Sequence, residues 1–416
     1  MSKPHTPDPN PANTHRQAPA APPARVVIAG LGLVTPLGLN AWATFRALLQ
    51  GQSIADRAKA LPDALPPTDL VLALGGVSIA RHTATDPAVE LAERAAREAA
   101  AMAGRPTDGL RLWLGTSKGA IARLSTRQGL GHPPDEHDQH NIALGPHAFL
   151  AHQLAQRLGT SNQLQSGAAC ASGLVALDRA RRTLAYADDT AEPYALVATA
   201  DAALTPAFVH SYLRLGVLAE PTADGYRQRP LDQRRRGFML SEIGAAVLLR
   251  RLSPGETPKP GEVELLHTAT ACEAFDMIRT PPTMPALTHI AGQLRDHLPQ
   301  GETLGVLHPH APGTPDHDPH ELNVLREVFG DSPLLYACKG ALGHGLGSAG
   351  LAALVIACLT LRANRLPPMP WLERPIYPPR NPEPQTPDSR ATHAVFAAGF
   401  GGHTAGALIQ RPRTGP

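Results

Sequence analysis

The sequence predicts an α/β protein built from two similar halves. Predicted strands alternate with predicted helices along most of the chain, which is typical of buried sheets covered by helices. Two distant segments, SGAACASGLVALDRARRTLA (166–185) and KGALGHGLGSAGLAALVIACLTLR (339–362), each lead from a Gly/Ala-rich turn into a helix, which suggests an internal duplication. The chain has 416 residues, of which 43% are hydrophobic, so it can form one large core or two structural halves.

Hydrophobic periodicity and Gly/Pro punctuation place the individual elements. The segment RVVIAGLGLVTPLG (25–38) is predicted to be a buried strand that ends in a turn, and 393–411 two strands that turn at Gly401 and Gly402. Further strands are expected at 110–115, 194–200, 245–251, 262–270, 303–308 and 334–338. Helices are expected at 40–50, 88–104, 146–158, 172–187, 286–298, 320–329 and 349–363.

Composition divides the chain into three parts. Residues 1–24 are predicted to be a disordered tail, because their composition is rich in Pro and Ala. The two α/β halves are assigned to 25–252 and 253–411, and the Pro-rich segment 366–387 is expected to be a surface connection.

Bulk properties exclude several classes of function. There are 38 Lys and Arg against 36 Asp and Glu, with no dense basic run, so no nucleic-acid partner is expected. The N-terminus lacks the apolar core of a signal peptide, and the run Leu351 to Leu359 is too short to span a bilayer. The four cysteines, which form no CxxC pair, suit a reducing compartment; they are Cys170, Cys272, Cys338 and Cys358. These features predict a cytoplasmic protein with no membrane association.

The glycines of the first strand invite a dinucleotide-binding hypothesis, which the spacing argues against. Gly30 and Gly32 fit the start of a GxGxxG motif, but Thr35 stands where the third glycine belongs. A GxG pair alone is a weak signal.

Cys170 is the strongest candidate nucleophile. It lies among small residues at the predicted start of a helix, where the helix dipole favours a thiolate and a substrate can approach closely. The alternative is an inert cysteine that fills a tight core, as many free cysteines do.

Two histidine-containing segments offer further chemistry. GVLHPHAPGTPDHDPHE (305–321) follows a predicted strand, and its His and Asp residues invite a metal-hydrolase hypothesis. No HExxH spacing is present, and the prolines predict an extended loop, in which His317 and His320 are solvated. The second segment supplies His344, again among glycines and ahead of a helix. No metal site is predicted.

Taken together, these segments resemble the elongating β-ketoacyl-acyl carrier protein synthases of the thiolase superfamily, over about residues 25–411. AACASG resembles the nucleophile motif, HPHAPGTP the first histidine motif, KGALGHG the Lys-x-x-x-Gly-His block and GFGGH the Gly-Phe-Gly-Gly turn. RPLDQRRRGFMLSEIGA (229–245) resembles a further family block, with Glu242 in its acidic place. The resemblance implies a thiolase-like fold with two pseudo-repeated halves in α-β-α-β-α layers.

The resemblance also implies an activity, namely decarboxylative Claisen condensation of an acyl thioester with malonyl-acyl carrier protein. It assigns catalytic roles to Cys170, His310, His344 and Lys339, and the oxyanion hole to the N–H groups of Cys170 and Phe400. Thr314, Gly399 and Phe400 are expected to bind substrate. No cofactor is expected, because phosphopantetheine arrives on the carrier protein. The implied partners are acyl carrier protein and a second subunit, in a homodimer or in a heterodimer with a ketosynthase-like chain.

Several residues depart from the family pattern. Ala311 and Pro312 replace the Gly and the first Thr after the histidine, so Thr314 alone retains a hydroxyl for the pantetheine arm. His308 replaces an Asn and Ala353 a Glu, at positions that border a cation site in some relatives. Arg236 replaces an Asp, and the chain is identified as a divergent member, of a fatty acid, polyketide or aryl-polyene type pathway.

Two other functions remain open at this point. A non-catalytic, chain-length-factor-like partner of a ketosynthase would typically lack the cysteine that this chain keeps. A degradative thiolase would use a second cysteine near the C-terminus, whereas the last cysteine here is Cys358 and the GFGGH turn has none.

Overall fold

The computed structural model describes residues 22–60, 67–77, 85–129, 133, 135–160, 162–188, 190–219, 228–377 and 392–412. The predicted tail lies almost entirely outside these residues, as does part of the Pro-rich connection. The described strands are β1 (Val26–Val34), β2 (Arg111–Gly115), β3 (Asn162–Ser166), β4 (Tyr194–Asp201), β5 (Ile243–Arg251), β6 (Val263–Cys272), β7 (Leu304–His308), β8 (Leu334–Leu335), β9 (Thr392–Gly399) and β10 (His403–Gln410).

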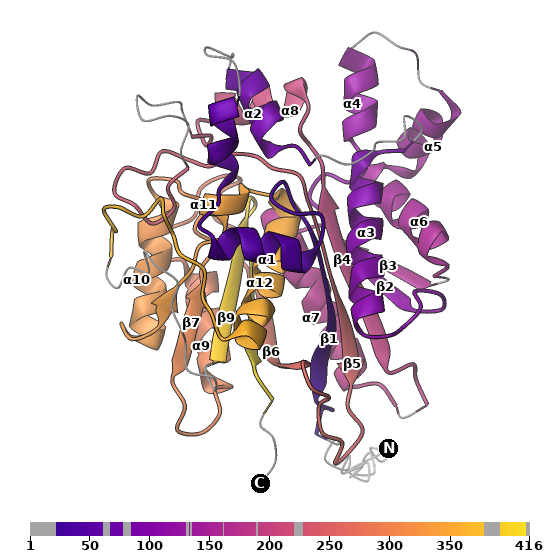
Figure 1. Cartoon of the computed structure of the whole chain (residues 1–416), viewed down its shortest axis with the longest axis vertical. Coiled ribbons are helices and arrows are strands. Elements are labelled where there is room, and N and C mark those ends of the chain that lie inside the picture. The colour runs from indigo at the N-terminus through magenta and orange to yellow at the C-terminus, as the bar shows by residue number, and fades with distance from the viewer. Residues whose placement is uncertain are drawn as a thin grey trace, which may run out of the picture.

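Helices surround and separate these strands (Figure 1). The α-helices are α1 (Ala41–Leu49), α2 (Pro67–Gly75), α3 (Pro87–Met102), α4 (Ala122–Gly129), α5 (Glu136–Leu144), α6 (Pro146–Leu158), α7 (Ser172–Ala185), α8 (Pro206–Arg214), α9 (Pro285–Asp296), α10 (His317–Phe329), α11 (Lys339–Leu342) and α12 (Ala349–Ala363). Three 3₁₀ turns are η1 (Ile54–Ala60), η2 (Ala169–Ala171) and η3 (Leu346–Ser348).

The sheet topology repeats in the two halves of the chain. The strand order is β3-β2-β4-β5-β1-β6-β10-β9-β7-β8, so the first five strands and the last five have the same order when each half is followed inward from its edge. In each half the two outer pairings are parallel and the two inner ones antiparallel. Only two residue pairs, Val27–Glu264 and Ile28–Val263, join the halves in the sheet. This confirms the predicted duplication.

The two half-sheets enclose a central helical layer. Helix α7 packs on strands of both halves, including β4 and β10, and α12 packs on β5 and β9. Outside them, α3 covers the first half-sheet and α9 the second (Figure 1). These are the α-β-α-β-α layers of the thiolase-like fold. One segment, Leu346–Ala363, is apolar and long enough to cross a bilayer by composition, but 89% of it is buried inside the protein, as expected of a core helix.

The glycines of β1 serve packing. A Cβ placed on Gly30 would lie 1.8 Å from the carbonyl oxygen of Ala99, and one on Gly32 would lie 1.9 Å from that of Ala95. Helix α3 therefore lies directly on the backbone of β1. This close contact explains the GLG sequence without a dinucleotide site.

The structure corrects the sequence-based elements in two places. The proline-containing segment after β7 is not extended up to residue 320, because α10 begins at His317 with Pro319 in its first turn, where proline is tolerated. Strand β3 and helices α2, α4, α5, α8 and α11 were not predicted. Of these, β3 has the polar sequence NQLQS and lies at the edge of the sheet, so hydrophobic alternation gives no signal for it.

The contact between α3 and β1 can be tested by one substitution. Gly32→Ala should lower the free energy of unfolding by about 1–3 kcal/mol, because the added methyl group displaces α3. Gly292→Ala in α9 is the matched control, since nothing lies within 4 Å of its Cβ, and it should be neutral or stabilising by up to about 1 kcal/mol. Urea denaturation of both variants measures the difference, and equal stability would contradict the close approach.

Candidate active site

Cys170 lies in a tight turn between β3 and the central helix α7. The turn is η2, in which Ala169 has a positive φ of 46°. The Ser172 hydroxyl accepts a hydrogen bond from the backbone N–H of Ala168 (2.9 Å) and donates one to the carbonyl of Ala169 (2.6 Å). The thiol is thereby held at the start of α7, as the sequence predicted, and it lines a cavity of about 630 Å³.

The expectation of a resting thiolate at this helix start was wrong. Burial raises the pKa of Cys170 to about 12; Lys339 and Lys118 oppose this shift and Asp201 adds to it. The residue is 8% exposed, so a charged sulfur would lose most of its hydration. The resting group is therefore a neutral thiol.

The turn between β9 and β10 lies against the Cys170 turn. A Cβ on Gly399 would lie 2.7 Å from the carbonyl oxygen of Ala168 and 2.8 Å from the amide nitrogen of Cys170, so only glycine fits. Phe400 follows it and lines the cavity. In the part of the chain that the structure describes, neither the Cys170 N–H nor the Phe400 N–H donates a hydrogen bond. Both donors are available to a ligand.

His310 and His344 face the same cavity, with ring centroids 5.4 Å apart. The N–H of Leu346 donates to Nδ1 of His344 (3.0 Å), so the proton of the neutral ring lies on Nε2. Burial, together with Lys339 and His317, lowers the pKa of both rings well below the usual value. Both histidines are therefore neutral at physiological pH, and His344 can donate from Nε2.

Buried charged residues fix the histidine loop. The carboxylate of Glu321 accepts hydrogen bonds from the N–H groups of His310 (2.6 Å) and Ala311 (2.7 Å). Ala311 has a φ of 33°, and this pairing helps to hold it in the left-handed region. Lys339 donates from Nζ to the carbonyl oxygen of His310. Lys339 thus contacts the backbone of the loop rather than the cavity.

His308 does not face the cavity. It is buried in β7, and its Nε2 lies 3.2 Å from Nδ1 of His393 in the neighbouring strand β9. Within the described residues no cluster of three or more His, Cys, Asp or Glu side chains could hold a metal ion. Ala353 is buried in α12 and supplies no ligand atom.

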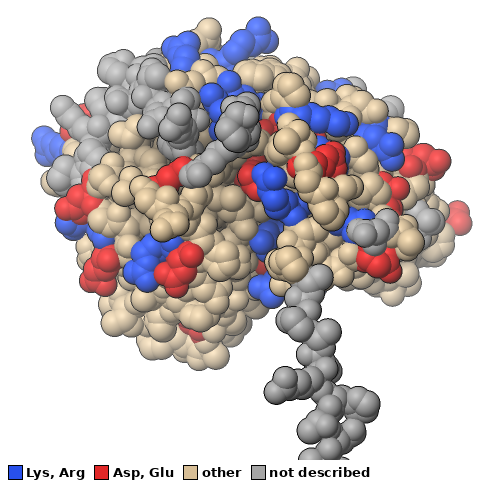
Figure 2. Space-filling view, turned by 90° about the horizontal axis from the view of Figure 1, so that it is seen from below, with Lys and Arg blue, Asp and Glu red and all other residues tan. Residues whose placement is uncertain are grey.

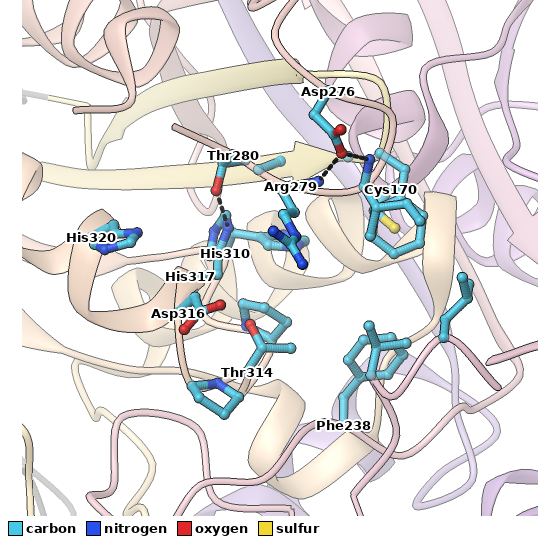
Figure 3. A pocket seen from close by; sticks show the side chains of 18 of the residues that line it. Cys170, Phe238, Asp276, Arg279, Thr280, His310, Thr314, Asp316, His317 and His320 are labelled. Carbon is cyan, nitrogen blue, oxygen red and sulfur yellow. Dashed lines mark hydrogen bonds between the residues drawn. The ribbon is translucent and has the colours of Figure 1, made fainter. Parts of the chain in front are cut away.

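The structure adds residues that sequence reasoning missed. His317 and His320 were expected in solvent, yet both line the cavity (Figure 3). His317 packs edge-on against His310, with centroids 5.2 Å apart, and its Nδ1 lies 3.5 Å from the hydroxyl of Thr280. The signal that could have found them is their spacing of three, which places them on one face of a helix. Thr314, which is expected to bind substrate, also lines the cavity.

The cavity has two unlike walls. Figure 3 shows Cys170 and Phe238 on one side and Thr280, Asp316 and His317 on the other. Phe238 packs against His344, with ring centroids 4.7 Å apart. The thiol side is mainly apolar, with Asp276 and Arg279 also close to Cys170 in Figure 3, and the side of the histidine loop is polar. This arrangement suits a ligand with an apolar arm and a polar arm.

Family models match both halves of the chain. Residues 24–255 match the model of the beta-ketoacyl synthase N-terminal domain, and residues 263–373 match that of the C-terminal domain. The chain belongs to the beta-ketoacyl synthase family. These are condensing enzymes of fatty acid and polyketide biosynthesis, as the names of the relatives below indicate.

Individual relatives are distant. The chain is 26% identical to 3-oxoacyl-[acyl-carrier-protein] synthase 2 of Coxiella burnetii over 84% of its length and 89% of the relative's. It is 26% identical to the tetracenomycin polyketide synthase ketoacyl synthase alpha subunit of Streptomyces glaucescens over 94% of its length and 97% of the relative's. This low identity is consistent with a divergent member.

Solved structures share the fold. A beta-ketoacyl synthase from Burkholderia phymatum superposes with a TM-score of 0.77 at 20% identity, covering 94% of this chain and all of that one (100%). The ketosynthase/chain length factor of ishigamide gives 0.74 at 22% identity, with 94% and 99% of the two chains covered. A type II polyketide synthase carrier protein bound to its ketosynthase and a hexaketide gives 0.76 at 20% identity, with 94% and 100% covered.

The raised pKa of Cys170 predicts a specific pH dependence of its alkylation. With a pKa of about 12, the thiolate fraction rises about tenfold per pH unit, so iodoacetamide should label Cys170 about tenfold faster at each step from pH 7 to 9. Peptide mapping by mass spectrometry measures the rate, with exposed Cys272 as the internal reference. Labelling of Cys170 that levels off below pH 8 would show that the thiolate is present at rest.

Proposed function

We propose that this protein catalyses decarboxylative Claisen condensation of an acyl thioester with malonyl-acyl carrier protein, giving a β-ketoacyl-acyl carrier protein. The observation that carries the proposal is the convergence of Cys170, His310 and His344 on one cavity. A thiol nucleophile and two neutral imidazoles are the groups that acyl transfer and enolate stabilisation require. Membership of the beta-ketoacyl synthase family supports the same reaction.

The first step is acyl transfer to Cys170. The sulfur attacks the carbonyl carbon of the incoming thioester, the bond from that carbon to the pantetheine sulfur breaks, and the thiol proton ends on the departing pantetheine thiol. The N–H groups of Cys170 and Phe400 stabilise the oxyanion, since they are free and lie in adjoining turns. Burial, which raises the pKa of the Cys170 thiol, disfavours charge on the sulfur, and the acyl-Cys170 thioester carries none.

The second step joins two carbon units. The extender loses CO₂, and its thioester oxygen becomes an enolate oxygen that accepts hydrogen bonds from His310 and His344. The enolate carbon attacks the acyl-Cys170 carbonyl, a C–C bond forms, and the C–S bond to Cys170 breaks. The released thiolate takes a proton from solvent. His344 is suited to its role because Nδ1 already accepts from Leu346, which leaves Nε2–H for the enolate.

Lys339 is a positioning residue in this mechanism. Its Nζ holds the carbonyl of His310, while Glu321 holds the two N–H groups of the same loop. The loop therefore keeps its shape as charge develops on the ligand, which is how preorganised sites lower a barrier.

Partners follow from the same proposal. Acyl carrier protein delivers both substrates on phosphopantetheine, so no resident cofactor is required, and Thr314 and Gly399 line the route of that arm. A homodimer or heterodimer would extend the sheet at its open edge strand β3, where Leu164 is 50% exposed. We place the protein in the cytoplasm, where carrier-protein substrates are made.

Variants separate the two steps. Cys170→Gln should abolish acyl transfer but retain decarboxylation of malonyl-carrier protein, because the histidines remain. His310→Ala and His344→Ala should each lower decarboxylation by about 10²–10³-fold, the loss typical of one oxyanion donor. Release of ¹⁴CO₂ measures this step, and intact mass measures acylation of Cys170.

The exposed His289→Ala variant in α9 is the control and should keep both rates. If both active-site histidine variants decarboxylate at the wild-type rate, the enolate role is wrong. If no acyl thioester loads Cys170 in the wild type, the protein instead serves as a chain-length-factor-like partner.

The histidine loop predicts a preference for carrier-bound substrates. Pro312 lines the cavity but has neither a hydroxyl nor an N–H, so it gives no hydrogen bond to pantetheine. One such bond is worth about 0.5–1.5 kcal/mol, or several-fold in affinity. Pro312→Thr should therefore raise kcat/KM for acyl-CoA by several-fold and change that for the acyl-carrier protein less. A wild-type enzyme that uses acyl-CoA as well as the carrier-bound substrate would contradict this, and melting temperatures check the fold.

A further inference from the structure

Tyr212 is a buried phenol on the apolar wall of the cavity. It lies in α8, is 5% exposed and lines the cavity together with Cys170. Its ring stacks on Phe400, with centroids 6.5 Å apart and planes at 22°, and contacts Phe238 edge-on at 6.2 Å. Phe400 adjoins the Cys170 turn and Phe238 contacts His344. Two rings that belong to the reaction centre thus fix Tyr212 in place.

The hydroxyl of Tyr212 has no protein partner. Among the described residues no side chain or backbone group makes a hydrogen bond with it. The hydroxyl oxygen is not completely buried and keeps some accessible surface. Tyr212 lines the cavity, so the hydroxyl is a candidate to meet a ligand there. Burial raises the pKa of Tyr212, with Cys170 acting in the same direction, so the group stays a neutral phenol that can donate.

The surroundings make this hydroxyl stand out. Tyr212 and Cys170 belong to one hydrophobic cluster with three further residues that line the cavity, Val217, Phe238 and Phe400. Burying a polar group in apolar surroundings without a hydrogen-bond partner costs about 1–3 kcal/mol in free energy. A ligand that supplies an acceptor to this hydroxyl therefore binds more tightly than one that does not. Hydroxyl-bearing sites of this kind discriminate strongly between ligands with and without the matching oxygen.

We propose that the Tyr212 hydroxyl donates a hydrogen bond to an oxygen on the acyl group carried by Cys170. The acyl donor that this site selects is then an oxygenated acyl thioester, such as a 3-oxoacyl thioester, in preference to a saturated one. This inference rests on the proposed condensation, and it assigns Tyr212 as a specificity-determining residue. The apolar wall accommodates the carbon chain, while the phenol recognises the oxygen.

The test compares two donors that differ in one oxygen. Pantetheine thioesters of 3-oxohexanoate and hexanoate are each incubated with the protein, and intact mass gives the rate constant for acylation of Cys170. Because both donors carry the same pantetheine, its contacts cancel in the ratio of the two rates. We expect wild type to favour the 3-oxo donor and Tyr212→Phe to lower the ratio of 3-oxo to saturated rates by about three- to tenfold.

Tyr186→Phe is the matched control, because Tyr186 is 70% exposed and does not line the cavity, and its ratio should equal that of wild type. The proposal would be overturned if Tyr212→Phe left the ratio of the two acylation rates unchanged, including the case in which both rates fall equally. The hydroxyl would then hydrogen-bond bound water or the pantetheine arm. Failure of both donors to acylate Cys170 in the wild type, including when each acyl group is delivered on acyl carrier protein, would instead overturn the proposed condensation. Melting temperatures of the two variants exclude a folding defect.

Discussion

The close packing of α7 on α12 is the constraint on which the site depends. Both helices lie in the central layer, and a Cβ on Gly173 near the start of α7 would lie 3.0 Å from the carbonyl oxygen of Gly347, just before α12. The helix starts therefore meet, which places the Cys170 turn beside the His344 turn. Because each turn follows the edge strand of its own half, the duplicated topology brings distant residues together.

The two halves also share a device for holding the loops around the cavity. In the first half the carboxylate of Asp201 accepts from the N–H groups of Ser117 and Lys118, in the loop after β2. In the second half Glu321 accepts from two N–H groups in the loop after β7, the equivalent strand. Asp201 further accepts from the N–H of Gly347, so one buried carboxylate ties both halves at the site.

Sequence reasoning found the groups whose position depends on local motifs. Cys170, His310 and His344 each stand in a short Gly- or Ala-rich turn next to a predicted element, and the structure brings them to one cavity. The protonation state of Cys170 was not predictable in this way. It depends on the burial of the turn beneath the second half, and that burial outweighs the helix dipole that the sequence suggested.

Residues on helices that reach the cavity from elsewhere in the fold were also missed. Tyr212 lies in a helix that was not predicted, and His317 belongs to a helix start that its prolines concealed. Whether these residues line the cavity depends on which side of α8 and of α10 is turned toward it. Only tertiary packing determines that orientation. The edge strand β3 was not predicted either, because its polar sequence shows no hydrophobic alternation.

The duplication explains why the site can perform two reactions. Identical topology supplies two helix starts and two carboxylate-held loops, yet the halves differ in the side chains that they present. The first half contributes the thiol that accepts an acyl group, and the second contributes the neutral imidazoles. Burial favours both assignments, because it keeps the thiol and the imidazoles uncharged until a ligand brings charge into the cavity. The charge that develops on the ligand oxygens then forms beside donors that are already in place, so little reorganisation is needed.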